Sequence, residues 1–258
     1  MPTLPFLRMQ AVMWYNRSGS FCLRGLIQPM IQMRDVSKIY DDTGAVALDR
    51  VSVDIGKGEF VFIVGASGAG KSTFIKMLFR EVLPSSGILK VNGYDIARMP
   101  ESDVPYLRRG LGIIFQDYRL LPDKTVYENV AFAMQVIEAP RRLIQRTVNS
   151  VLDVVGLRDK YRSFPTQLSG GEQQRVAIAR AIVNDPAIVI ADEPTGNLDP
   201  ETSWDIMDIF QRINAAGTTI VMATHDKNIV DTMQKRVIAI ENGHIVRDQM
   251  RGVYGYEA

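Results

Sequence analysis

The nine residues that follow a short apolar run combine small side chains with one lysine and three hydroxyl groups. The run Phe60 to Val64 precedes GASGAGKST, and the stretch STFIKMLF continues with a helical pattern. In a strand, loop and helix of the form G-x-x-x-x-G-K-[ST], backbone N–H groups converge on phosphate oxygens, and bulky side chains would block that approach. We therefore expect a nucleoside triphosphate to contact Gly65, Ala66, Ser67, Gly68, Ala69, Gly70, Lys71, Ser72 and Thr73.

Two of these side chains and two later carboxylates predict phosphoryl transfer to water. Lys71 would reach the β- and γ-phosphates as a point charge, and the Ser72 hydroxyl would be a ligand of Mg²⁺. The apolar run AIVIA ends in Asp192 and Glu193, which would be unfavourable in a core and so should face a cleft. Asp192 suits a water-mediated partner of Mg²⁺, and Glu193 suits a general base that orients and deprotonates the attacking water.

A third stretch, LSGGEQQRVAIARAIV at 168–183, predicts a second anion site far from the first in the sequence. Its Ser-Gly-Gly indicates a bare turn that caps a helix, and we expect that helix to begin at Glu172. The N-terminus of such a helix can donate hydrogen bonds to phosphate.

The elements that position these residues alternate between short β-branched runs and amphipathic helical stretches. This alternation is typical of an α/β sheet with helices packed on it, and runs that are apolar on both faces indicate central parallel strands. No strand is expected from Asp117 to Pro165, so a helical subdomain at about 117–168 is inserted in a single domain spanning 30–258. The expected strands are 31–36, 51–55, 60–64, 88–91, 111–115, 187–191, 218–223, 237–241 and 244–247.

Composition sets limits on where the chain works. The 258 residues are 46% hydrophobic, and 30 Lys and Arg nearly balance 29 Asp and Glu for a net charge of +1, so no global charge favours nucleic acid or an anionic membrane. No apolar run approaches the length of a membrane-spanning helix, and the single cysteine, Cys22, has no intrachain disulfide partner, so we expect a cytoplasmic protein. Residues 1–29 lack sustained periodicity and are placed outside the fold, either as a misassigned start before Met30 or Met33 or as a mobile arm.

The stretch LSGGEQQ, spaced between the two phosphate-site motifs as here, resembles the signature of the ATP-binding cassette (ABC) ATPases. The resemblance runs from about Met30 to about Arg247 and implies further roles. Tyr40 matches the aromatic residue that stacks on adenine, and Gln116 matches the glutamine that binds Mg²⁺ and links the site to a membrane partner. Asp199 matches the aspartate that crosses the dimer interface, and His225 matches the histidine at the γ-phosphate, whereas His244 is expected to be structural.

The family resemblance also implies a head-to-tail homodimer with two shared ATP sites. Ser169, Gly170 and Gly171 of one chain would contact the γ-phosphate held by the other. Because the chain carries one cassette and no spanning helix, a membrane partner would be a separate polypeptide, docked near YRLLPDKTVYENV at 118–130.

The stretch 103–134 most resembles the family members that act in cell division. This resemblance implies a peripheral protein on the cytoplasmic face of the membrane at the division site, indirectly linked to extracellular peptidoglycan hydrolases. The alternatives are ATPases of lipoprotein-releasing, macrolide-exporter or amino-acid-import systems. ABC-type ATPases of ribosomes or DNA carry tandem cassettes or long coiled coils, and no basic stripe is evident here, so nucleic acid is not expected.

Overall fold

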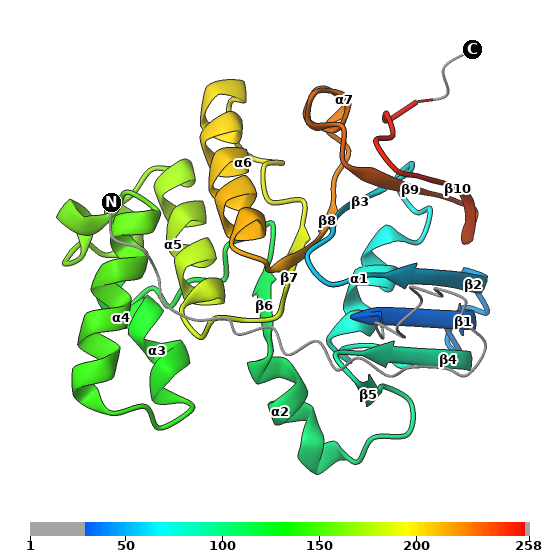
Figure 1. Cartoon of the computed structure of the whole chain (residues 1–258), viewed down its shortest axis with the longest axis horizontal. Coiled ribbons are helices and arrows are strands. Elements are labelled where there is room, and N and C mark those ends of the chain that lie inside the picture. Colours follow the sequence, from blue (N-terminus) through cyan, green and yellow to red (C-terminus); the bar gives the residue numbers. More distant parts are fainter. Residues whose placement is uncertain (1–28, 256–258) are drawn as a thin grey trace, which may run out of the picture.

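A computed structural model describes residues 29–255, and these form two sheets with helices between and around them (Figure 1). The strands are β1 (Ile31–Ile39), β2 (Val46–Ile55), β3 (Phe60–Val64), β4 (Ser86–Val91), β5 (Tyr94–Asp95), β6 (Leu111–Ile114), β7 (Ile188–Asp192), β8 (Thr219–Ala223), β9 (Arg236–Glu241) and β10 (His244–Gln249). The α-helices are α1 (Lys71–Leu78), α2 (Val104–Arg109), α3 (Val126–Gln135), α4 (Arg141–Val154), α5 (Gly170–Ile182), α6 (Pro200–Ala215) and α7 (Lys227–Met233). Short 3₁₀ turns lie at Glu101–Asp103, Arg158–Lys160 and Pro165–Gln167.

The larger sheet has the strand order β10-β9-β3-β8-β7-β6, in which β9, β3, β8, β7 and β6 are parallel and β10 pairs antiparallel with β9. Every residue of β3 and β8 is buried, because helices and the second sheet cover both faces of these strands. The smaller sheet, β2-β1-β4-β5, is antiparallel throughout. The expected α/β class, with a mostly parallel core and an antiparallel edge, is therefore confirmed.

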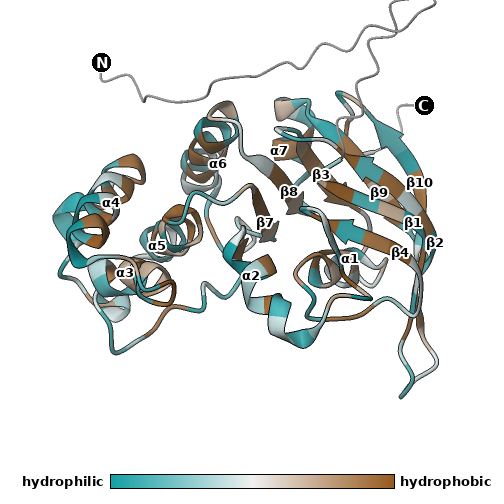
Figure 2. Cartoon of the chain, turned by 60° about the horizontal axis from the view of Figure 1, so that its bottom comes forward, coloured by the Kyte–Doolittle hydropathy of each residue, from teal (hydrophilic) through white to brown (hydrophobic). Residues whose placement is uncertain are grey.

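The central strands separate two hydrophobic clusters because alternate side chains of a strand point to opposite faces. In β3, Phe60, Phe62 and Val64 belong to one cluster, whereas Val61 and Ile63 belong to the other. Figure 2 shows apolar colouring concentrated on the strands in the interior of the molecule. The side chains of the candidate site lie where β3, β7 and β8 end, so both hydrophobic clusters support their positions.

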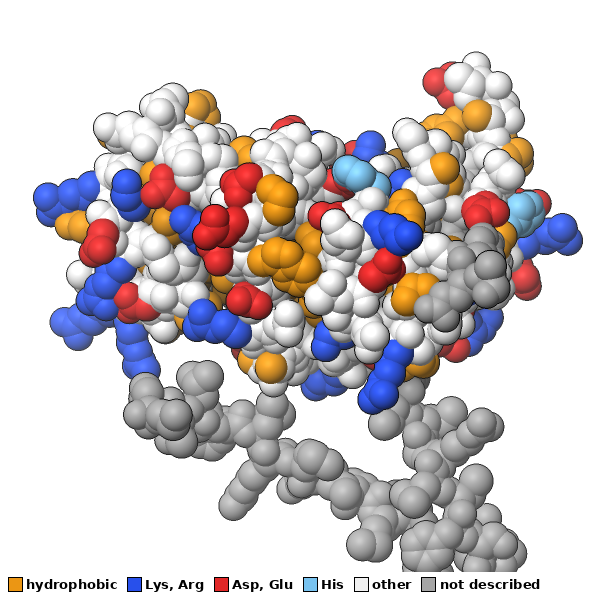
Figure 3. Space-filling model, turned by 90° about the horizontal axis from the view of Figure 1, so that it is seen from above, with side chains coloured by type: hydrophobic (Ala, Val, Ile, Leu, Met, Phe, Trp, Pro, Cys, Tyr) orange, Lys and Arg blue, Asp and Glu red, His pale blue; other side chains and the backbone are white. Residues whose placement is uncertain are grey.

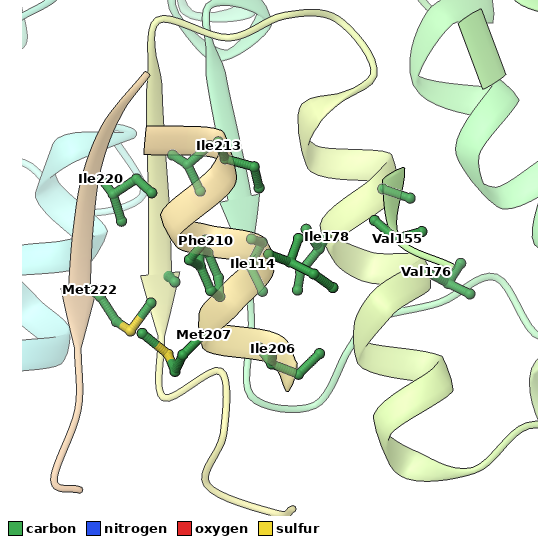
Figure 4. Packing of buried hydrophobic residues seen from close by; sticks show 14 of the residues in the cluster. Ile114, Val155, Val176, Ile178, Ile206, Met207, Phe210, Ile213, Ile220 and Met222 are labelled. Carbon is green, nitrogen blue, oxygen red and sulfur yellow. The ribbon is translucent and has the colours of Figure 1, made fainter. Parts of the chain in front are cut away.

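Helix α6 closes one cluster with an apolar stripe at helical spacing. Ile206, Met207, Phe210 and Ile213 are buried and face the central sheet, and their neighbours come from several elements (Figure 4). The labelled neighbours are Ile114 of β6, Ile220 and Met222 of β8, Val155, and Val176 and Ile178 of α5. This packing joins the sheet to the helices that follow β6 along the chain.

Helices α3, α4 and α5 form a group at one end of the molecule (Figure 1). The sequence starts α3 and α5 in the same way, with a capping box: Thr125 with Glu128, and Ser169 with Glu172. In each box the hydroxyl accepts the N3 amide while the glutamate accepts from the N-cap residue, so both helices begin at defined residues.

The expected strands are all present, with ends that differ by a few residues. The structure extends the first strand to residue 39 and begins the second at residue 46. It also adds the two-residue strand β5, which is too short to give an alternating pattern. The signature helix begins at Gly170 rather than at Glu172, because Ser169 is its N-cap. The expectations for residues 1–28, Cys22 included, lie outside the described residues, and the structure describes Pro29 only as an irregular residue before β1.

Candidate active site

The loop between β3 and α1 has a backbone that only small residues fit. Gly65, Gly68 and Gly70 have φ of 147°, 78° and 113°, which L side chains rarely adopt. A Cβ at Gly65 would overlap the carbonyl of Ile240, and one at Gly70 would overlap the carbonyl of Ala47. The glycines therefore allow the loop to pass close to neighbouring strands and turn into the N-terminus of α1.

Lys71, the first residue of α1, is folded back over this loop. Its side chain is largely buried, and Nζ donates hydrogen bonds to the carbonyl oxygens of Gly65 at 2.8 Å and Ala66 at 3.0 Å. These contacts hold the ammonium group inside the loop, next to the amides at the helix N-terminus. Positive charge and N–H donors thus face the same small space, which is what phosphate oxygens require.

Tyr40 lies beside the same loop rather than on the far edge of its sheet. Its hydroxyl is 3.2 Å from Oγ1 of Thr73, and the ammonium of Lys38 lies 5.2 Å from the centre of its ring. The residue follows β1 directly, in a turn, so its ring is available next to the loop.

Asp192 and Glu193 lie at the carboxyl end of β7, beside the phosphate loop. Burial, and secondarily the charge of Glu193, raise the pKa of Asp192, while Lys76, Lys71 and a hydrogen bond from Ser72 oppose the rise. The Ser72 hydroxyl and the Asp192 carboxylate therefore lie near each other. Both are oxygen ligands of the type that Mg²⁺ prefers.

Glu193 has a left-handed backbone, with φ of 52°, that is uncommon for a residue with a side chain. Its amide donates to the carbonyl of Ala223 at the end of β8, at 2.9 Å, which fixes the turn. Its carboxylate contacts Nδ1 of His225, which follows β8. The two residues expected to act on water and on the γ-phosphate are therefore direct neighbours at the ends of adjacent strands.

Gln116 joins this group from the end of β6. A Cβ built on Gly196 would lie 3.2 Å from Nε2 of Gln116 and 3.5 Å from Oε2 of Glu193, so both side chains border the same glycine. Asn197 also donates to the carbonyl of Gln116 at 3.5 Å. Four segments that are distant in the sequence thus meet at one edge of the sheet, as the parallel topology requires.

The signature turn lies elsewhere in the same chain. Helices α5 and α1 lie on opposite sides of β6 and β7 in Figure 1, and on opposite sides of β7 in Figure 2. Ser169 caps α5 and accepts the amide of Glu172 at 3.2 Å, and the backbone amide of Ser169 lowers the pKa of Glu172. In one copy of the chain, the helix that carries the signature turn is therefore separate from the glycine loop.

Asp199 is the N-cap of α6, in the exposed loop beyond Glu193. It accepts hydrogen bonds from the side chain of Thr202 at 2.6 Å and from its amide at 2.9 Å, and these bonds lower the pKa of Asp199. Gly171 of the signature turn packs against Thr202, since a Cβ there would overlap its methyl group. His244, by contrast, is the exposed first residue of β10, and its ring lies 3.6 Å from Asp49.

Two residues that the sequence analysis passed over hold the segment after Gln116. Arg180 of α5 donates to the carbonyls of Arg119 at 2.6 Å and Tyr118 at 2.9 Å, and both of those residues have positive φ. Asn129 of α3 is fully buried and hydrogen-bonds to the loop 121–125 through its whole amide. A polar residue within the apolar stripe of α3 is the signal that could have identified Asn129.

Charge and length place further limits on the site's surroundings. Acidic and basic side chains are both spread over the face in Figure 3, so no single sign dominates it. In residues 29–255, no helix has the length and apolar character needed to cross a bilayer. The same residues contain no group of three or more His, Cys, Asp or Glu placed to hold a metal.

Comparison with known proteins agrees with this geometry. The family model described as ABC transporter matches residues 48–196. The chain is 61% identical over 228 residues to the "Cell division ATP-binding protein FtsE" of Streptococcus pneumoniae serotype 2, covering 88% of this chain and 99% of that protein. It is 58% identical over 226 residues to the protein of the same name from Bacillus subtilis, with the same coverage, and 48% identical over 216 residues to that of Escherichia coli, covering 84% and 97%.

Among solved structures, a dimeric ATP-binding cassette in a post-hydrolysis state, bound to ADP and Pi, superposes with a TM-score of 0.79. It is 32% identical and covers 88% of this chain and 100% of the other. The family model's match, residues 48–196, includes the glycine loop, the paired carboxylates and the signature turn. The chain belongs to the ABC transporter family of ATP-binding proteins and, within it, to the cell division ATP-binding proteins of the FtsE type.

Proposed function

We propose that the chain hydrolyses ATP to ADP and phosphate at two sites shared by a homodimer, and that this drives a membrane partner in cell division. The observation that carries the proposal is the meeting of Lys71, Glu193, His225 and Gln116 at one sheet edge, with the signature turn held apart on the other side of β6 and β7. A complete phosphate site then needs a second copy.

The phosphate groups bind in the glycine loop. The amides at the start of α1 donate to them, and the ammonium of Lys71 gives up its carbonyl partners in favour of the β- and γ-phosphates. Tyr40 stacks on the adenine. No bulky side chain stands in the way, because the loop glycines have none.

Glu193 is the general base. Its contact with Nδ1 of His225 fixes the carboxylate, and its left-handed backbone ends the strand at this residue. Glu193 orients the attacking water and accepts its proton, while His225 contacts the γ-phosphate and Gln116 completes the pocket. General-base catalysis of this kind contributes about 10²–10⁴-fold to a rate.

The oxygens of Ser72, Gln116 and Asp192 are of the type that Mg²⁺ prefers. The Ser72 hydroxyl lies near Asp192, and Gln116 borders Gly196 together with Glu193. Bound Mg²⁺ would neutralise charge that develops on the phosphates. The elevated pKa of Asp192 in the chain without ligand is consistent with a carboxylate that awaits a cation.

In the dimer, Ser169, Gly170 and Gly171 of one copy contact the γ-phosphate held by the other, and Asp199 lies at the interface. Dimeric ATP-binding cassettes among the solved structures, at 32% and 33% identity, support this arrangement. Exposed Ser169 has its hydroxyl oriented by the capping box, and the ionised Asp199 is held by Thr202, so both are prepared for a partner.

The partner would be an FtsX-like transmembrane protein, which places this chain on the cytoplasmic face of the membrane at the division site. The names of the relatives support the division role, and the segment 118–130 next to Gln116 supplies a docking surface. Through that partner, ATP turnover would act indirectly on extracellular peptidoglycan hydrolases.

The test of the chemistry is Glu193→Gln, with Glu138→Gln as the control. Glu138 is exposed in the turn between α3 and α4, so its replacement removes the same charge far from the site. We expect Glu193→Gln to lower phosphate release at least about 100-fold while ATP binding persists and the ATP-bound dimer accumulates. Wild-type hydrolysis by Glu193→Gln would overturn the assignment of the base.

The test of the partner uses the same variant. Glu193→Gln is captured from detergent-extracted native membranes with ATP present, and the membrane protein that accompanies it is identified. A partner with few spanning helices and a large extracellular domain supports the division role. A many-helix permease with a solute-binding protein would instead make the chain a transporter subunit.

A further inference from the structure

The residues after β10 form an irregular segment in which each of residues 252–255 makes a hydrogen bond. The amide of Gly252 donates to the carbonyl of Lys235 at 2.9 Å, and the amide of Tyr254 donates to Oδ1 of Asp231 at 2.6 Å. A Cβ at Gly252 would lie 2.8 Å from Cβ of Val237, so the backbone runs directly against β9. The segment therefore lies in a fixed position against α7 and β9.

Arg247 of β10 holds the same segment from the other side. Its guanidinium donates to three successive carbonyl oxygens, those of Val253 at 2.6 Å, Tyr254 at 2.9 Å and Gly255 at 2.9 Å. A guanidinium can serve several acceptors only when they converge in its plane, so the turn at 253–255 is shaped around this side chain. We call residues 252–255 with Arg247 the C-terminal brace.

The element that the brace holds is α7, which is too short to be stable alone. It has seven residues, of which only Ile229 and Val230 are buried, and isolated helices of this length are unstable in water. The brace donates to two residues near the C-terminal end of this helix: Asp231, in its last turn, and Lys235, two residues beyond it. The N-cap of α7 is Asp226, the residue directly after His225.

The ring of Tyr254 adds apolar packing to these hydrogen bonds. It packs against the hydrophobic cluster that contains Ile229 and Val230, the two buried residues of α7. Burial, and secondarily the negative charge of Glu193, raise the pKa of Tyr254. The brace is therefore joined to α7 by packing as well as by hydrogen bonds.

We propose that the C-terminal brace positions His225 by fixing α7, so that Arg247 and Tyr254 are positioning residues for hydrolysis. His225 and the N-cap of α7 are consecutive, and a displacement of the helix moves the imidazole away from Glu193. The inference rests on the proposed ATP hydrolysis for its kinetic part, whereas the ordering of α7 can be measured without any hydrolysis.

The experiment compares full-length wild-type protein with Arg247→Met and Tyr254→Ala. Arg251→Met is the matched control, since Arg251 is exposed and only four residues from Arg247. Two quantities are measured: amide hydrogen exchange in α7 and in α6, and the kcat and KM for ATP with Mg²⁺. Tyr254→Ala keeps the Arg247 side chain, so it serves as the second variant if Arg247→Met fails to fold.

We expect exchange in α7 to rise at least about fivefold in both variants while exchange in α6 stays unchanged. The kcat should fall about tenfold or more with KM within twofold, because a small misplacement of a catalytic group slows chemistry without weakening ATP binding. The control should match wild type in both measurements.

Unchanged hydrogen exchange in α7 would overturn the proposal that the brace fixes this helix, whatever the kcat for ATP. Faster exchange in α7 with unaltered kcat would show that the brace does not position His225, and would equally overturn the inference. If the wild-type protein failed to hydrolyse ATP, the proposed function would fail, while the exchange measurement would still decide whether the brace holds α7.

Discussion

Replacing Asn129 with leucine should destabilise the loop that follows Gln116. Asn129 is fully buried, and its Nδ2 donates to the carbonyls of Leu121, Lys124 and Thr125 at 3.1, 2.9 and 3.0 Å. Its Oδ1 accepts the amide of Leu121 at 2.8 Å. Leucine has nearly the same size and fits the apolar surroundings on α3, so the main effect is the loss of these four hydrogen bonds.

The size of the effect depends on which backbone groups have a second partner. The carbonyl of Thr125 keeps the amide of residue 129 at 2.8 Å, and the carbonyl of Leu121 keeps the amide of Lys124 at 3.2 Å. The Leu121 amide and the Lys124 carbonyl then lose the partner that the structure gives them. An unsatisfied buried group costs about 1–3 kcal/mol, and this loop is partly exposed, so we expect a total loss of about 2–3 kcal/mol.

The assay is equilibrium urea unfolding of the chain without nucleotide. Asn149→Leu, at a half-exposed position on α4, is the matched control and should stay within about 0.5 kcal/mol of wild type. Asn129→Asp should be at least as destabilising as Asn129→Leu at neutral pH, because a carboxylate cannot donate to carbonyl groups. An Asn129→Leu protein as stable as the control would refute the reasoning.

Three further outcomes follow from the site. Burial and the charge of Glu193 raise the pKa of Asp192, so its ionised form is less stable in the folded chain than in the unfolded chain. Asp192→Asn should therefore raise the melting temperature of the chain without ligand at pH 7. This gain should vanish below about pH 4, because the carboxyl group is then protonated in both states. Gly65→Ala should lower ATP affinity at least about tenfold, measured by ATP titration, because its Cβ would meet a backbone carbonyl. Gly68→Ala has open space around it and should lower the unfolding free energy by only about 1 kcal/mol, measured by thermal melts, through its positive φ. Ser169→Ala should lower the unfolding free energy by about 1 kcal/mol through the lost helix cap, and a thermal melt that matches wild type would contradict this.

The fold and the centre of the site could be predicted because their signals are local. The run FVFIV predicts β3 because a strand covered on both faces is apolar at every position, and β3 is buried throughout. The loop after it follows from glycines and a lysine at fixed spacing. Asp192 and Glu193 could be placed beside that loop without coordinates, because parallel strands end at the same edge of the sheet.

The supporting contacts could not be predicted because they join residues that are far apart in the sequence. Arg180 reaches the carbonyls of Tyr118 and Arg119 across 62 and 61 positions, and nothing in ARAIV distinguishes it from a solvated arginine. The C-terminal brace is similar: sequence resemblance ended at about Arg247, and only the fold shows which carbonyls that side chain bonds.

Arg180 connects the segment after Gln116 to the helix that carries the signature turn. Arg180 bonds the backbone of Tyr118, and a Cβ on Gly170 would lie 3.1 Å from the hydroxyl of that same tyrosine. Tyr118 is therefore held to α5 near both ends of the helix, while Gln116, two residues earlier, borders Glu193. A shift of the Gln116 segment when phosphate binds must either break these contacts or carry α5 with it. Charge-assisted hydrogen bonds such as those of Arg180 are the stronger kind, so movement of α5 together with the segment is favoured. In the proposed dimer, this movement would shift the signature turn that serves the opposite site.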